Sequence, residues 1–67
     1  MKSLGGMINE ERAMRGMTIK FLSEKTGIPY SMLQPCLCGR REFRADEYFK
    51  VCYCLGIDPI ATYNSVS

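Results

Sequence analysis

The chain has 67 residues, a formal net charge of +2 and four cysteines, but neither histidine nor tryptophan. This length accommodates one small domain, so we treat residues 1–67 as a single unit. Without histidine or a glycine-rich phosphate loop, we expect no enzyme. No apolar run approaches the ~20 residues of a membrane span, and residues 1–6 do not resemble a secretory signal. We therefore expect a cytoplasmic protein that has no membrane partner and keeps its thiols reduced.

Four glycines, at positions 16, 27, 39 and 56, each follow an amphipathic segment. Glycine readily adopts the left-handed conformation that ends helices, and no alternating strand pattern occurs. The pattern predicts an all-α fold with five short helices, over Met7–Arg15, Thr18–Thr26, Pro29–Cys38, Ala45–Leu55 and a last segment that begins at Asp58-Pro59. Met7 is an alternative start of the chain, which would leave residues 1–6 as a frayed leader.

Caps and apolar spacing orient these segments. Thr18 is a favourable N-cap, and Asp58 followed by Pro59 is typical of a helix start. In the first segment, the residues expected to face inward are Ile8, Ala13 and Met14. In the fourth, four residues recur at helical spacing, which indicates a largely buried helix: Tyr48, Phe49, Cys52 and Leu55.

The stretch Thr18–Ile28 (TIKFLSEKTGI) resembles the start of the helix-turn-helix in the phage lambda repressor and Cro class. Ser31–Leu33 then stands where the recognition helix of that family runs, and Gly39–Arg41 resembles the exit from it. Asp46–Asp58 resembles the fourth helix and its Leu-Gly-Ile turn. The resemblance covers about two thirds of the chain without a gap. It implies a compact five-helix lambda repressor-like domain that binds double-stranded operator DNA as a repressor.

The resemblance also implies roles for particular residues. The groove-facing positions expected to read base edges are Tyr30, Ser31 and Gln34. Contacts to DNA phosphates are expected from Thr18, Lys20, Arg40, Arg41 and Arg44. A homodimer is expected, since so apolar a fifth helix on so small a core should be covered, and its candidate surface is Ile57, Ile60, Tyr63 and Val66. No cofactor or metal is implied.

Pro35 departs from the family pattern. A proline inside the third helix removes the hydrogen bond to the Ser31 carbonyl, at ~3 kcal/mol in a helix interior. The third helix should therefore be kinked or split into two turns. In addition, residues 28–38 contain no charge, so Gln34 alone could pair bidentately with a base, an adenine. Leu37 replaces an acid common in relatives, so Arg12 must find Glu42, Glu47 or solvent.

These departures support an alternative function, a protein-interaction module such as an antirepressor or phage-encoded inhibitor. Its binding patch would comprise Ile28, Pro29, Tyr30, Met32 and Pro35. The cysteines form two Cys-x-Cys pairs, but helical residues two apart point about 200° apart and cannot share a metal. We interpret Cys36, Cys52 and Cys54 as small buried hydrophobes. A metal site or disulfide is the alternative, if Pro35 distorts the third helix.

Overall fold

The computed structural model describes the backbone of residues 3–66 and the side chains of residues 3–65. Five helices account for most of this part, and it contains no strand, which confirms the all-α prediction. They are α1 (Leu4–Met14), α2 (Ile19–Thr26), α3 (Tyr30–Leu37), α4 (Ala45–Leu55) and α5 (Pro59–Val66). None of these helices is long and apolar enough to cross a bilayer.

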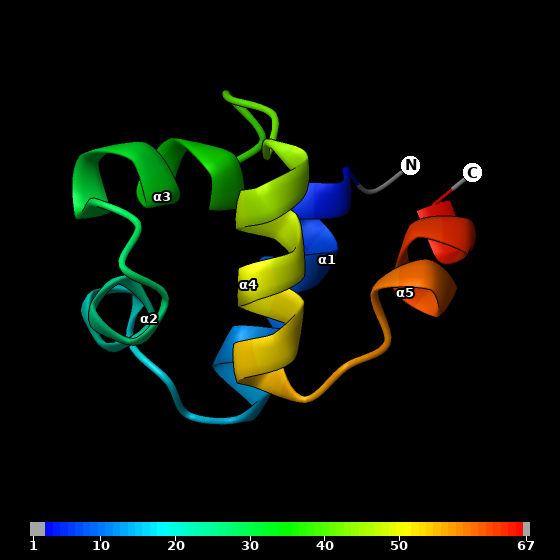
Figure 1. Ribbon diagram of the computed structural model, residues 1–67, viewed down its shortest axis with the longest axis horizontal. Coiled ribbons are helices and arrows are strands. Elements are labelled where there is room, and N and C mark those ends of the chain that lie inside the picture. Colours follow the sequence, from blue (N-terminus) through cyan, green and yellow to red (C-terminus); the bar gives the residue numbers. More distant parts are fainter. Residues whose placement is uncertain (1–2, 67) are drawn as a thin grey trace.

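Helix α4 lies at the centre of the molecule, where it contacts α1, α2 and α5 (Figure 1). Helices α2 and α3 lie on one side of it and α5 on the other. The molecule has a radius of gyration of 10.5 Å and measures 28 × 23 × 21 Å. Its fully buried side chains come from the first four helices: Ile8, Leu22, Leu33, Leu37, Val51, Cys36 and Cys52. Helices α2 and α3 are thus each held against the core by buried leucines of their own.

Helix α1 begins at Leu4, three residues before the predicted start of the first helix at Met7, so residues 4–6 belong to the helix and are not frayed. Ser3 is the N-cap, and its Oγ accepts a hydrogen bond from the Gly6 N–H at 3.0 Å. This bond satisfies one of the free N–H groups that every helix start exposes. Residues 1–2, the remainder of the expected leader, lie outside the described part of the chain.

Gly5 marks the point where α1 approaches α3 most closely. A Cβ atom at this position would lie 1.9 Å from the Cys36 carbonyl oxygen, far inside van der Waals contact. Gly5 is itself buried, so the absence of a side chain allows the two backbones to meet. The Gly5-Gly6 pair resembles a helix breaker in the sequence, which is why the start of α1 is predicted too late.

Helix α3 continues through Pro35 as one helix of eight residues, so the predicted split into two turns is wrong. The proline is the sixth of these residues, and only one main-chain donor is missing. The Pro35 carbonyl accepts hydrogen bonds from the N–H groups of Arg40 at 2.9 Å and Arg41 at 3.2 Å. These bonds attach the following connector, residues 38–44, to the end of α3.

Three expectations about individual side chains need correction. Ile8 is buried as predicted, but Ala13 and Met14 are exposed, since five and six residues along a helix bring them round to the side away from Ile8. Phe49 is half-exposed beside α5 rather than buried. Arg12 bonds neither Glu42 nor Glu47. Its Nε donates to Asn9 Oδ1 at 2.9 Å and its Nη1 to the Met17 carbonyl, which joins α1 to the following turn.

The cysteines confirm the hydrophobic interpretation in part. Cys36 and Cys52 are buried, whereas Cys54 is half-buried and Cys38 is exposed. All four are free thiols. Within the described residues, no group of three or more His, Cys, Asp or Glu side chains could hold a metal ion.

Candidate nucleic-acid interface

The turn between α2 and α3 is held by short polar contacts. Gly27 has φ 76°, a left-handed conformation that favours glycine, and its N–H donates to the Ser23 carbonyl at 2.9 Å. The Ser23 hydroxyl donates to the Ile28 carbonyl at 2.6 Å, and the Ile28 side chain is buried in the core. Figure 1 shows α2 end-on while α3 runs across the view, so the two axes are far from parallel.

Two of the predicted base-contact residues are exposed in the first turn of α3. Tyr30 has a relative exposure of 52%, and Ser31 is also exposed. Gln34, the third, lies one turn further along and is half-buried. Because residues three and four apart share a helix face, these three side chains lie along one side of α3. The opposite side is formed by the buried Leu33, Cys36 and Leu37.

Gln34 is tied to two residues at the far end of α3. Its Oε1 accepts a hydrogen bond from Arg40 Nη2 at 3.1 Å, and its Nε2 donates to Cys38 Sγ at 3.0 Å. An arginine N–H can only donate, so the amide oxygen must face Arg40. These contacts therefore fix which way the amide of Gln34 points. Gln34 is the one residue of the third helix that the sequence predicts to pair bidentately with a base.

Arg41, predicted to contact phosphate, turns towards the protein instead. Its Nη1 and Nη2 donate to the two carboxylate oxygens of Glu47 at 3.0 and 3.3 Å, and Nη1 also contacts Cys36 Sγ at 2.9 Å. Glu47 has a relative exposure of 8% and accepts a further bond from the Arg44 N–H at 2.9 Å.

The hydrogen bonds to Glu47, with a smaller contribution from Cys36, raise the pKa of Arg41. Those from Arg41, followed by the Arg44 N–H, lower the pKa of Glu47. Sequence reasoning named Glu47 only as a possible partner of Arg12. Its carboxylate forms one half of a capping box with the Arg44 N–H, but an arginine at the N-cap lacks the usual sequence signal for that motif.

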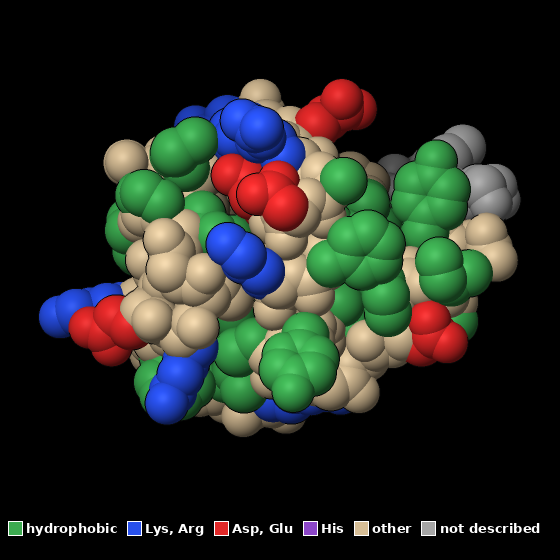
Figure 2. All heavy atoms as spheres, viewed as in Figure 1, with side chains coloured by type: hydrophobic (Ala, Val, Ile, Leu, Met, Phe, Trp, Pro, Cys, Tyr) green, Lys and Arg blue, Asp and Glu red, His purple; other side chains and the backbone are tan. Residues whose placement is uncertain are grey.

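The other phosphate candidates lie at two ends of the α2–α3 unit. Thr18 caps α2 as predicted, since its Oγ1 accepts from the Phe21 N–H at 3.0 Å, and Lys20 is exposed in the same turn. Arg44 is exposed at the end of the connector, with its Nε 3.7 Å from Asp46 Oδ1. Lys and Arg side chains accordingly gather at the top of Figure 2, over the connector, and at its left, over α2. The described basic candidates therefore lie at the start of α2 and at the end of the connector that follows α3.

The predicted dimer surface is only partly present on α5. Ile60 and Tyr63 are exposed, at 62% and 58%, but Ile57 packs against the core. The side chain of Val66 lies outside the described residues. The exposed pair adjoins an apolar hollow of about 320 Å³ between α4 and α5, lined by Leu4, Phe43, Ala45, Tyr48, Phe49 and Pro59. Figure 2 shows hydrophobic side chains gathered over this side of the molecule.

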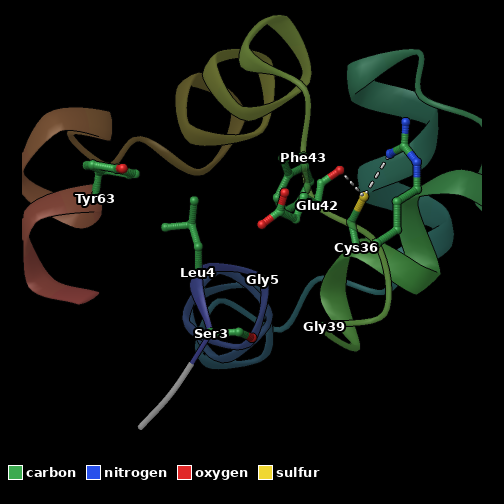
Figure 3. Close-up of a pocket in the computed structure, with 9 residues that line it drawn as sticks. Ser3, Leu4, Gly5, Cys36, Gly39, Glu42, Phe43 and Tyr63 are labelled. Carbon is green, nitrogen blue, oxygen red and sulfur yellow. Dashed lines mark hydrogen bonds between the residues drawn. The ribbon is translucent and has the colours of Figure 1, made fainter. Parts of the chain in front are cut away.

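A second cavity, of about 400 Å³, lies where α1 meets the connector (Figure 3). Leu4 and Phe43 lie between Tyr63 of α5 and the Cys36 thiol, which contacts the Glu42 carbonyl at 3.9 Å. In the described part of the chain, every buried side-chain nitrogen and oxygen has a hydrogen-bond partner. The cavity thus offers no unpaired buried side-chain polar atom to a ligand.

Comparison with protein-family models, with curated proteins and with solved structures found no match to this chain. Its function is therefore inferred from the residues and the geometry described above.

Proposed function

We propose that this chain is a small sequence-specific DNA-binding regulator with a lambda repressor-like helix-turn-helix, in which α2 and α3 form the motif. The observation that carries the proposal is the composition of the outward side of α3. It presents Tyr30, Ser31 and Gln34 together, all able to hydrogen-bond base edges, and it is flanked by basic side chains. In this arrangement α3 enters the major groove while α2 crosses the backbone.

The phosphate contacts fall on the residues that remain free to reach outward. Thr18 and Lys20 supply one end of the motif and Arg44 the other. Arg41 has a structural role in this proposal, because its guanidinium fork is occupied by Glu47. Such contacts release counterions, so binding should weaken steeply as the salt concentration rises.

The proposed regulator acts as a homodimer that associates through α5. Ile60, Tyr63 and the neighbouring Phe49 supply the apolar surface. Helix α5 lies on the opposite side of α4 from α2 and α3, so this association leaves both copies of α3 exposed (Figure 1). Two symmetric copies would read half-sites about 34 Å apart, one helical turn of DNA.

The test is a fluorescence anisotropy titration with duplexes selected from a randomised pool, repeated at several salt concentrations. We expect a selected duplex to compete at least about 1,000-fold better than random duplex. Lys20→Ala and Arg44→Ala should each weaken binding to every duplex and reduce the salt slope by about one. Lys50→Ala, which removes the same charge from the exposed side of α4, is the matched control. If no selected duplex outcompetes random DNA, sequence-specific regulation is wrong.

One observation favours the second candidate, a protein-interaction module. Tyr30 and Met32 are exposed on a helix without charge, as in a protein-binding surface. The structure removes Ile28 from the expected patch, because that side chain is buried. Pro35→Arg separates the two functions, since it adds a positive charge beside the proposed groove face. It should strengthen duplex binding by a regulator, whereas a module would bind no duplex specifically before or after the change.

A further inference from the structure

Arg40 is held against the reading side of α3 by the way that helix ends. Gly39 has φ 80°, and its N–H donates to the Cys36 carbonyl at 3.3 Å. The Arg40 N–H reaches back to the Pro35 carbonyl at 2.9 Å. This pair of bonds is the Schellman motif, which turns the chain back along the helix it leaves. The backbone of Arg40 consequently stays next to the last turn of α3.

The side chain of Arg40 then follows the same side of the helix as Gln34. Its Nη2 lies 3.1 Å from Gln34 Oε1, although the two residues are six apart in sequence. The three connector arginines thus have three different environments. Arg41 binds the Glu47 carboxylate, Arg44 lies near Asp46, and Arg40 contacts a neutral amide. Arg40 therefore adds a positive charge beside the outward side of α3, a helix that contains no charged residue.

We propose, on the basis of the proposed DNA-binding function, that Arg40 is a specificity-determining residue that reads a guanine next to the adenine read by Gln34. A guanidinium has five N–H donors, and Arg40 uses one of them on Gln34. The remaining donors can form the bidentate pair with guanine O6 and N7, the commonest specific contact in the major groove. This assigns to Arg40 a base edge in place of the phosphate that the sequence pattern implies.

Gln34 keeps its own reading capacity in this arrangement. Its Oε1 has a second lone pair and its Nε2 a second hydrogen, which match N6 and N7 of adenine. Arg40 and Cys38 hold the amide on both sides, so the oxygen and nitrogen are already oriented before DNA binds. Such pre-orientation reduces the side-chain entropy lost on binding. Arg40 thus acts both as a reader and as a positioning residue for Gln34.

The experiment compares Arg40→Ala and Arg40→Lys with Arg44→Ala on the selected duplex, on random duplex and on duplexes with single substitutions. Lysine keeps the charge but lacks the fork, so it separates base reading from phosphate binding. We expect both Arg40 variants to lose about 5- to 100-fold on the selected duplex and to relax the preference for guanine at one position. Their affinity for random duplex should change much less. Arg44→Ala should weaken both duplexes alike.

A measurement without DNA tests the positioning role separately. In two-dimensional NMR of the free protein, Arg40→Ala should shift the side-chain amide signals of Gln34, and Arg44→Ala should not. Arg40 variants that weaken selected and random duplexes equally would overturn this inference while leaving sequence-specific binding intact. Failure of the unaltered protein to prefer any duplex would overturn the proposed function and this inference with it.

Discussion

The carboxylate of Glu47, at the start of α4, accepts hydrogen bonds from both terminal nitrogens of Arg41 in the connector after α3. This partly buried contact, reinforced by the Arg44 N–H, fixes the connector relative to α4. It also explains why two neighbouring arginines face in different directions. Arg41 binds Glu47, whereas the side chain of Arg40 lies along α3 and contacts Gln34.

Glu47→Gln should destabilise the fold and reduce its sensitivity to acid. The bonds from Arg41 and Arg44 lower the pKa of Glu47 below its ordinary value of 4.5. The stability they contribute is therefore present above about pH 4.5 and is lost as the pH falls through the lower, folded-state value. Replacing the charged acceptor should cost about 1–3 kcal/mol at neutral pH, measured by urea denaturation.

The acid dependence supplies the sharper part of this test. The free energy of unfolding should decline less between about pH 5 and pH 3 in Glu47→Gln than in the unaltered protein. Glu42→Gln makes the same chemical change on an exposed connector side chain and is the control. Equal acid dependence in Glu47→Gln and the unaltered protein would contradict the role assigned to this carboxylate.

Gly5→Ala should lower the stability of the protein, although alanine normally favours helices over glycine. The added methyl group would sit 1.9 Å from the Cys36 carbonyl oxygen, so α1 and α3 must move apart. We expect a loss of about 2 kcal/mol or more in chemical denaturation. Gly6→Ala is the matched control, because its Cβ would meet only the Ser3 hydroxyl at 3.2 Å. A loss in Gly6→Ala as large as that in Gly5→Ala would refute the close approach at Gly5.

The helices that glycines terminate could be predicted from sequence, because a left-handed residue ends a helix wherever it occurs. Accordingly, α2 and α4 match their expected ranges to within a residue. The start of α1 could not be predicted, because Gly5 is required by a contact with Cys36, 31 positions later in the chain. Nothing local distinguishes a glycine that breaks a helix from one that lets two helices touch.

The candidate site likewise has features that local sequence predicts and others that only the fold determines. The exposure of Tyr30 and Ser31 follows from the helical period of α3, which local sequence encodes. The separate environments of Arg40 and Arg41 depend on Glu47 and Gln34, which the fold brings to the connector. A cluster of like charges in sequence therefore indicates a basic surface but does not assign each arginine its partner.

Pro35→Ala should stabilise the protein. Alanine restores an N–H that can bond the Ser31 carbonyl within an uninterrupted helix. We expect a gain of about 1–3 kcal/mol, which corresponds to a Tm increase of several degrees in a domain of this size. Pro29→Ala is the comparison, because Pro29 precedes the helix as its N-cap and costs no helical hydrogen bond. A Tm that falls in Pro35→Ala would mean that the proline ring fits its site better than an alanine does.

Tyr48→Phe should loosen the attachment of α5. The Tyr48 hydroxyl donates to the Pro59 carbonyl at 2.5 Å, and burial raises the pKa of this phenol, so it stays protonated. Losing the donor removes a hydrogen bond that joins α4 to the first turn of α5, at about 1 kcal/mol. Amide hydrogen exchange should accelerate in α5 more than in α2. Tyr53→Phe, on a side chain 89% exposed, should leave exchange unchanged. Uniform acceleration over all helices would show that the bond supports the whole fold rather than α5.

Ile60→Glu should prevent the proposed self-association through α5 without unfolding the monomer. Ile60 and Tyr63 are exposed beside the apolar hollow between α4 and α5, so burying them against a second copy removes apolar surface from water. A carboxylate at this position would be desolvated in the dimer and would face its own symmetry mate. Sedimentation equilibrium should give a dimer for the unaltered protein, a monomer for Ile60→Glu, and a dimer for Tyr53→Glu, which changes an exposed residue elsewhere on α4. Duplexes carrying two half-sites should then bind Ile60→Glu no more tightly than a single half-site. Dimerisation that survives this substitution would place the interface on another face of the molecule.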